Sequence, residues 1–181
     1  MNTDLHFATG NDVRITPPGV FDPLDAEFGF CVDLAATAKT CRVINRNGTP
    51  CYYGPDHELE GCSDALAIAW SDVFAGGAVG WCNPPYSRIL QPQFIAKAAR
   101  EARKGFTTVM LLPARPDTTA FHHYIWDKRT QQPRPGVEVR FIEGRIGFLD
   151  ENGEPIRDKH GRATRAPFPS MIVIFRNPPT S

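Results

Sequence analysis

Long apolar runs are missing from this chain. No stretch of the 181 residues approaches the roughly 20 consecutive apolar residues that a membrane-spanning helix needs. Residues 1–11 also lack a basic stretch followed by an apolar one, so we expect no secretory signal there. With 41% hydrophobic residues the chain is long enough to bury a core. We expect a single cytoplasmic domain spanning residues 1–181.

Cysteines are few, and their number and spacing do not indicate a disulfide framework. The five are an odd number and include no CxxC pair, which suits a reducing compartment. Cys41, Cys51, His57 and Cys62 lack the short paired spacings of zinc sites, so we expect no bound metal. Cys82 has no histidine near it in the sequence and is interpreted as a packing residue rather than a nucleophile.

The chain also lacks a net charge, but acidic and basic residues are unequally distributed between its two halves. Residues 1–96 hold 5 Lys/Arg and 11 Asp/Glu, a net charge of −6, whereas residues 97–181 hold 15 and 9, a net charge of +6. A basic half is a modest indication of a polyanionic partner, and solvated surface charge is the alternative.

Apolar segments of strand and helix length alternate along the chain. The pattern predicts strands over residues 28–34, 78–81, 106–112, 137–142 and 171–175, helices over 92–104 and 118–127, and a short helix or turn over 64–70. This alternation predicts an α/β fold, a mostly parallel sheet flanked by helices. Ligands of such sheets bind at the carboxyl ends of the strands. Asp33 and Asn83 each follow or end a strand, so we expect both to face one cleft.

The stretch Trp81-Cys82-Asn83-Pro84-Pro85-Tyr86-Ser87 carries the most chemical information. Two prolines remove backbone donors and fix an extended loop after the strand. An amide, carbonyl acceptors and an aromatic ring then stand together, which suits a planar group with hydrogen-bond donors, such as the exocyclic amine of a nucleobase. The alternative is a simple strand-ending turn.

A set of short motifs follows a fixed order along the chain. The set comprises Thr16-Pro17-Pro18, Phe21-Asp22, Glu27-Phe28-Gly29-Phe30, Asp33-Leu34-Ala35-Ala36, Asp64-Ala65-Leu66, Trp70, the loop 81–87, Leu112-Pro113-Ala114-Arg115, Gly144-Arg145-Ile146-Gly147-Phe148 and Pro169-Ser170-Met171-Ile172-Val173-Ile174-Phe175. This ordered set resembles the phage-type Dam family, small DNA adenine-N6 methyltransferases of bacteriophages and prophages. It covers about residues 16–175. The resemblance implies a Rossmann-like class I methyltransferase fold, S-adenosylmethionine as cofactor, DNA as partner and a bacterial host cell as location.

The resemblance also implies roles for individual residues. Those assigned to the cofactor are Thr16 and Pro17 at its methionine end, Asp33, Ala35 and Ala36 in the first cofactor motif, and Asp64 near its adenosine. Those assigned to catalysis are Asn83, Pro84, Pro85 and Tyr86. In the first motif this chain has alanines where related enzymes have glycines. The alternatives are structural: Asp33 as the cap of a following helix, Thr16-Pro17-Pro18 as an ordinary helix start, and Asp64 as a cap or surface acid.

The implied chemistry concerns a poorly nucleophilic amine. We expect the Asn83 side-chain oxygen and the Pro84 carbonyl to accept hydrogen bonds from the adenine amine, which directs its lone pair at the cofactor's methyl group. Tyr86 is expected to stack on the base. The target atom is inaccessible in a duplex, so the adenine is expected to flip into the pocket.

Basic side chains predict where DNA is held. Residues 144–165 are interpreted as a long basic hairpin or loop lying against phosphates, and its candidate contacts are Arg145, Arg157, Lys159 and Arg162. Arg115, after a strand end, is a further candidate. Residues 127–140, with Lys128, Arg129 and Arg134, are a second candidate segment.

Two other functions stay open at this point. A methyltransferase of the same class can act on RNA or on protein glutamine through a similar loop. The unusual alanine-rich motif also fits a catalytically inactive, nucleic-acid-binding relative.

Overall fold

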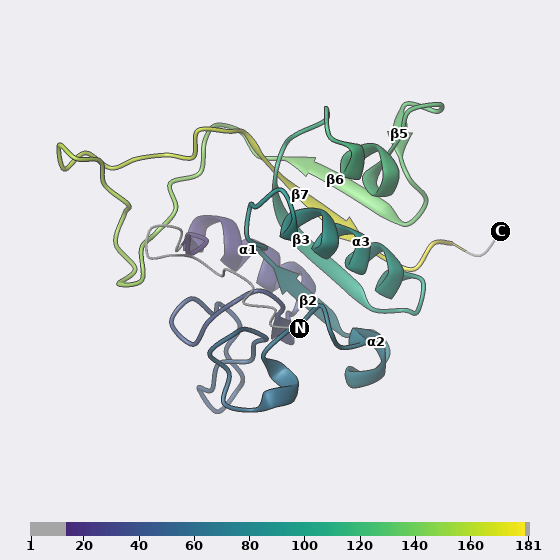
Figure 1. Cartoon of the computed structure of the whole chain (residues 1–181), viewed down its shortest axis with the longest axis horizontal. Helices are drawn as coiled ribbons and strands as arrows, with labels where there is room; N and C mark the ends of the chain where they lie inside the picture. Colours follow the sequence, from purple (N-terminus) through teal and green to yellow (C-terminus); the bar gives the residue numbers. More distant parts are fainter. Residues whose placement is uncertain (1–13, 180–181) are drawn as a thin grey trace.

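The computed structural model describes residues 14–179 and has three layers (Figure 1). The central sheet has five strands in the order β1-β2-β3-β7-β6. Their bounds are Val32–Asp33 for β1, Val79–Cys82 for β2, Thr107–Pro113 for β3, Val137–Phe141 for β6 and Ser170–Phe175 for β7. Helix α1 (Pro18–Phe28) covers one face and α3 (Leu90–Ala102) the other. The smaller elements are η1 (Glu60–Cys62), α2 (Trp70–Val73), the π-helical turn η2 (Phe121–Ile125), and the paired short strands β4 (Trp126–Asp127) and β5 (Gln132–Pro133).

The sheet is mixed, and this corrects part of the prediction. β1, β2 and β3 pair in parallel, whereas β7 pairs antiparallel with both β3 and β6. Four of the five strands therefore point the same way, but half of the pairings are antiparallel. The sequence pattern predicts β6 and β7 close to their observed positions. It does not show that β7 lies between β3 and β6 and runs antiparallel to both.

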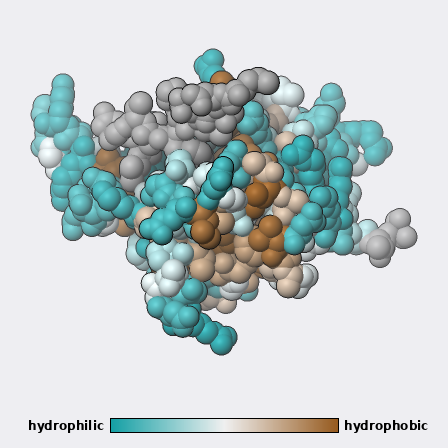
Figure 2. All heavy atoms as spheres, turned by 60° about the horizontal axis from the view of Figure 1, so that its bottom comes forward, coloured by the Kyte–Doolittle hydropathy of each residue, from teal (hydrophilic) through white to brown (hydrophobic). Residues whose placement is uncertain are grey.

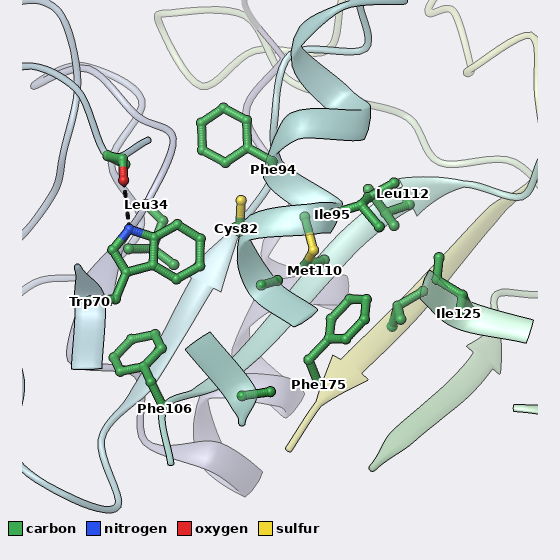
Figure 3. Packing of buried hydrophobic residues seen from close by; sticks show 14 of the residues in the cluster. Leu34, Trp70, Cys82, Phe94, Ile95, Phe106, Met110, Leu112, Ile125 and Phe175 are labelled. Carbon is green, nitrogen blue, oxygen red and sulfur yellow. Dashed lines mark hydrogen bonds between the residues drawn. The ribbon is translucent and has the colours of Figure 1, made fainter. Parts of the chain in front are cut away.

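Strand β3 shows how the core is divided. Met110 and Leu112 point to the face covered by α3, whereas Val109 and Leu111 point to the face covered by α1. All four are at most 1% exposed, as expected for a central strand whose side chains alternate between two covered faces. Figure 3 shows the α3 side, where these side chains pack with others such as Phe94.

Helix α1 replaces part of a predicted strand. Pro17 is its N-cap and Pro18 its first residue, where a missing N–H costs nothing, and Gly29 ends it with a φ of 63°. The strand predicted over residues 28–34 therefore shrinks to β1. The run of apolar residues there serves the helix end and the core instead.

Two predicted short elements are resolved by the structure. Of the helix or turn predicted over residues 64–70, residues 65–68 form the turn, and α2 begins only at Trp70, whose indole N–H donates to the Ala65 carbonyl at 2.7 Å (Figure 3). The helix predicted over residues 118–127 is observed over residues 119–125, where a first α-helical pair continues as the π-helical turn η2 and then directly as β4.

The described surface exposes a few large apolar side chains and one face with gathered apolar atoms. Figure 2 brings the lower side of Figure 1 forward and shows apolar atoms gathered in its middle with hydrophilic ones around them. The large exposed apolar residues are Ile44, Leu59, Val73, Ile89 and Phe141. No helix within residues 14–179 is long and apolar enough to cross a membrane.

Candidate active site

A cavity of about 720 Å³ lies at the carboxyl ends of β1 and β2. Its wall is formed by residues from the turn after β1, the loop after β2, and more distant segments: Arg14, Thr16, Asp33, Ala35, Ala36, Thr37, Ala38, Lys39, Thr40, Arg42, Pro55, Asp56, Trp81, Asn83, Pro84, Pro85, Tyr86, Ser87, Arg115, Glu151 and Phe168. Asp33 and Asn83 thus share one cleft, as expected for neighbouring parallel strands.

The side chain of Asn83 is held at both ends. Its Nδ2 donates to the Arg14 carbonyl oxygen at 3.0 Å and to Thr16 Oγ1 at 3.3 Å. Its Oδ1 accepts a hydrogen bond from the Tyr86 hydroxyl at 2.8 Å. A carbonyl only accepts, so the contact with Arg14 fixes which end of the amide is nitrogen. An amide oxygen has two lone pairs, so Oδ1 retains capacity for one more donor.

Tyr86 packs edge-on against two phenylalanines. Its ring centre lies 5.3 Å from that of Phe168 and 6.2 Å from that of Phe148. Burial raises the pKa of the Tyr86 hydroxyl above its ordinary value of 10. The hydroxyl is therefore a neutral donor to Asn83 throughout the physiological pH range.

Asp33 is a buried carboxylate that organises the turn after β1. Its Oδ1 accepts from the Ala35 N–H at 3.3 Å and its Oδ2 from the Arg42 N–H at 3.2 Å. Burial raises the pKa of Asp33 from 3.8 to about 7, although these hydrogen bonds and the nearby Arg42 charge act in the opposite direction. No helix begins between residues 34 and 59 of the described chain, which excludes a helix-cap role.

The turn after β1 packs closely against the neighbouring segment at Gly54. A Cβ on Gly54 would lie 1.7 Å from the Ala36 carbonyl oxygen, so only glycine fits there. The Ala36 N–H donates to the Tyr53 carbonyl at 3.2 Å, which holds the two segments together. Small residues at 35, 36 and 38 then leave the cavity open beside the turn.

The structure brings most of the residues assigned to the cofactor together, but not all of them. Thr16, Asp33, Ala35 and Ala36 line the cavity, as do all the residues assigned to catalysis. Pro17 is not among the lining residues: its carbonyl accepts the first hydrogen bonds of α1. Asp64 is not among them either, and its Oδ1 accepts from the Leu66 N–H at 2.8 Å in a local turn.

Several lining residues were missed in the sequence. Phe168 comes from the segment before β7, and the Arg115 guanidinium lies 5.8 Å from its ring centre. Asp56 accepts a hydrogen bond from the Ala38 N–H at 3.0 Å, and so supports the turn after β1. The only sequence signal for Phe168 was its place next to the closing Pro-Ser motif.

Residues 144–165 form two small turns in succession rather than one long hairpin. In the first, Asp150 Oδ1 accepts from the N–H groups of Asn152 and Glu154. In the second, Asp158 Oδ1 accepts from those of His160 and Arg162. We call these the acidic turn (150–154) and the basic turn (158–162).

The candidate DNA contacts are separate from the cavity wall, except for Arg115. Arg145, Arg157, Lys159 and Arg162 are exposed on the segment between β6 and β7. Arg157 donates to the Gly161 carbonyl, and Arg162 pairs with Asp158 at 2.9 Å. The acidic turn instead reaches the cavity, where Glu151 pairs with Lys39 at 3.0 Å.

Comparison with known proteins defines the family. The sequence matches none of the curated proteins with which it was compared. It does match the family model described as DNA N-6-adenine-methyltransferase (Dam) over residues 7–180. Members of this family are S-adenosylmethionine-dependent methyltransferases, and the family implies the Rossmann-like fold expected from the motifs. Because the match spans nearly all of the sequence, the chain belongs to the DNA N-6-adenine-methyltransferase (Dam) family.

Proposed function

We propose that this protein methylates N6 of adenine in DNA, with the acceptor base flipped into the cavity beside Asn83. The carrying observation is the amide of Asn83, which is held by hydrogen bonds at both ends and lines a cavity that it shares with the turn after β1. Family membership supports the methylation of adenine N6, and the geometry of the cavity supports Asn83 as the position where the base binds.

The loop after β2 supplies acceptors for the adenine amine. Asn83 Oδ1 accepts one N–H through its remaining lone pair, and the Pro84 carbonyl accepts the other. These bonds favour a tetrahedral nitrogen whose lone pair is available for attack. The amine is neutral at the start, so no base has to remove a proton before transfer, and alignment is the main contribution of the protein.

The turn after β1 fits the cofactor. A cavity of about 720 Å³ lies within the roughly 300–1,000 Å³ typical of small-molecule sites. Its wall carries side chains of both charges, acidic at Asp33, Asp56 and Glu151 and basic at Arg14, Lys39, Arg42 and Arg115, which suits a cofactor that itself carries charges of both signs. S-adenosylmethionine supplies a methyl group activated by its sulfonium. Thr16, Asp33, Ala35 and Ala36 are the residues that we expect to hold it.

Aromatic residues line the base side of the cavity. Tyr86 is fixed through its hydroxyl, and Phe168 lies beside it at the wall. We propose that the flipped adenine packs against this pair, because stacking on an aromatic face tolerates a base in any in-plane position.

DNA is held by the basic segment between β6 and β7. We propose that Arg145, Arg157, Lys159 and Arg162 contact phosphates, together with Arg115 at the cavity. The 144–165 segment is then an insertion of one methyltransferase domain that acts in the cytoplasm of a bacterial host, where its substrate lies.

Methylation assays with labelled S-adenosylmethionine test the proposal. DNA, RNA and a glutamine-containing protein are offered separately, and the methylated products are identified by mass spectrometry. We expect N6-methyladenine in DNA and a roughly 100-fold or greater loss of kcat in Asn83→Ala, because its hydrogen bonds act on the reacting amine. Asn47→Ala, at an exposed turn, is the matched control and should keep full activity.

Three outcomes would contradict the proposal. Methylation of RNA or protein alone would keep the enzyme class and change the acceptor. DNA binding without cofactor binding in calorimetry would indicate an inactive relative. Unchanged activity in Asn83→Ala would remove the loop from the mechanism.

A further inference from the structure

Ile89 is an exposed isoleucine at the start of α3. It is 72% exposed, the highest value among the large apolar residues of the described chain. Its backbone already has helical dihedrals, and Ser87 caps the helix: the Ser87 Oγ accepts from the Leu90 N–H at 2.8 Å and the Ser87 carbonyl from the Gln91 N–H at 3.3 Å. Neither helix capping nor the core therefore explains an isoleucine here.

Its position connects Ile89 to the cavity. Ser87 lines the cavity wall, and two residues of extended chain span at most about 7 Å. Arg88, between them, is exposed as well. The loop that presents Asn83 and Tyr86 to the base thus continues directly into an exposed apolar side chain beside a cation.

The other exposed apolar residues are placed differently. Val73 is on α2, which precedes the amino end of β2, at the opposite end of the sheet from the cavity. Phe141 ends β6 opposite Met171, and so lies at the cavity end of the sheet but on its outer strand. Only Ile89 shares the loop of the base-binding residues.

A flipped base leaves a gap in the stack that something must fill. Apolar side chains such as Ile, Leu and Phe enter base steps and stabilise the unstacked duplex. Unstacking and unpairing cost a few kcal/mol, and an inserted side chain recovers part of this cost. A side chain within about 7 Å of the cavity wall is within reach of the place that the adenine leaves.

We propose that Ile89 is an apolar wedge that enters the duplex where the target adenine leaves it, with Arg88 facing an adjacent phosphate. This inference rests on the proposed methylation of a flipped adenine. It adds a residue that assists extrusion of the base and does not touch the reacting atoms.

The test separates extrusion of the base from chemistry. Modified adenines are first mapped on DNA treated with the wild-type protein. Two duplexes containing a mapped site are then compared, one with thymine opposite the adenine and one with an abasic site there, where less pairing has to be broken. We expect Ile89→Ser to lower kcat/KM roughly tenfold on the paired duplex and less than about twofold on the abasic one. Its thermal midpoint should be unchanged, because Ile89 is exposed and Ser87 remains the cap of α3.

The controls define the opposite results. Val73→Ser should leave kcat/KM unchanged on both duplexes. Equal losses on both duplexes for Ile89→Ser, or no loss on the paired one, would overturn the wedge, as would a paired-specific loss in Phe141→Ser instead. Absence of N6-methyladenine with the wild-type protein is a separate result, visible before any variant is compared, and it overturns both the proposed function and the wedge.

Discussion

The acidic and basic turns have the same backbone and opposite charge. In each, an aspartate accepts two amide N–H groups and a glycine has a φ near 77°, with 78° at Gly153 and 76° at Gly161. The acidic turn carries Asp150, Glu151 and Glu154, whereas the basic turn and its flanks carry Arg157, Lys159, Arg162 and Arg165. One turn meets Lys39 at the cavity, and the other is exposed to solvent.

The comparison teaches that local geometry and function are specified separately. The hydrogen-bonding aspartate and the glycine determine the turn, and the remaining positions are free to carry either charge. We infer that the acidic turn serves the cavity wall and the basic turn serves DNA. Three predictions test this division, starting with the largest effect.

A third aspartate that accepts two backbone N–H groups should respond oppositely to pH. Asp33 accepts one N–H at each carboxyl oxygen, and burial raises its pKa to about 7. Asp158 accepts both at Oδ1, and hydrogen bonds from Arg162 and His160 lower the pKa of this partly exposed carboxyl. The stability that Asp33 contributes is complete below pH 3.8 and is lost as the pH rises through about 7. That of Asp158 is present above pH 3.8 and is lost in acid.

Urea unfolding between pH 3 and pH 8 measures both effects. We expect Asp33→Asn to remove a decline of about 4 kcal/mol between pH 4 and pH 7, since each pKa unit corresponds to about 1.4 kcal/mol. Asp158→Asn should leave that decline intact and change the curve only below about pH 4. The same slope in wild type and Asp33→Asn would show that burial does not govern this carboxyl.

Removing the charges of the basic turn should weaken DNA binding strongly. The variant R157Q/K159Q/R162Q/R165Q is expected to lower the affinity for DNA roughly 100-fold. It should also reduce the slope of log affinity against log salt concentration by up to about 4, because binding with fewer phosphate contacts releases fewer counterions from the DNA. Fluorescence anisotropy at several salt concentrations measures both quantities. E151Q/E154Q in the acidic turn is the counterpart and should not weaken binding.

A second basic segment provides the sharper control. Lys128 and Arg129 lie between β4 and β5, and Figure 1 shows these strands on the other side of the molecule from the 144–165 segment. If K128Q/R129Q rather than the basic-turn variant reduced affinity, the assignment of DNA to the basic turn would be wrong.

The prediction with the smallest effect tests whether the acidic and basic turns have equivalent backbone conformations. Alanine is strained at positive φ, so Gly153→Ala and Gly161→Ala should each cost roughly 1–2 kcal/mol of unfolding free energy, and by similar amounts. Gly147→Ala on the same segment is the control, because its Cβ would meet only the Thr164 carbonyl at an ordinary 3.7 Å. Unequal costs would mean that packing, not φ, distinguishes the turns.

Sequence patterns located the central elements and the loop 81–87 that lines the cavity. β3, β6, β7 and α3 lie within about two residues of their predicted ranges, because their apolar periodicity is long and clear. The start of α1 was given only as the alternative reading of Thr16-Pro17-Pro18, and its extent was missed, because the apolar run at its end resembled a strand. The helix predicted over residues 118–127 is observed over residues 119–125, mostly as the π-helical turn η2, because β4 follows at once.

The residues of the candidate site also divide into those that a local sequence pattern located and those that it did not. Asn83, Tyr86 and Asp33 were found because each stands directly at a strand end, where adjacent parallel strands bring side chains together. Pro17 and Asp64 were assigned from motif order alone, and their backbone contacts place them outside the cavity wall. Phe168 and Glu151 were missed, because they reach the cavity from a segment far along the chain.

By itself the sequence determined the family and the α/β class and singled out the loop 81–87 as the candidate catalytic loop, because these depend on residue types and on short-range spacing. Only the tertiary structure decided that β7 reverses the sheet, that Gly54 packs against the Ala36 carbonyl, and that the Arg14 carbonyl orients Asn83. Each of these is a contact between residues at least 18 positions apart. Such contacts depend on how packed layers meet, and no local pattern of residues encodes them.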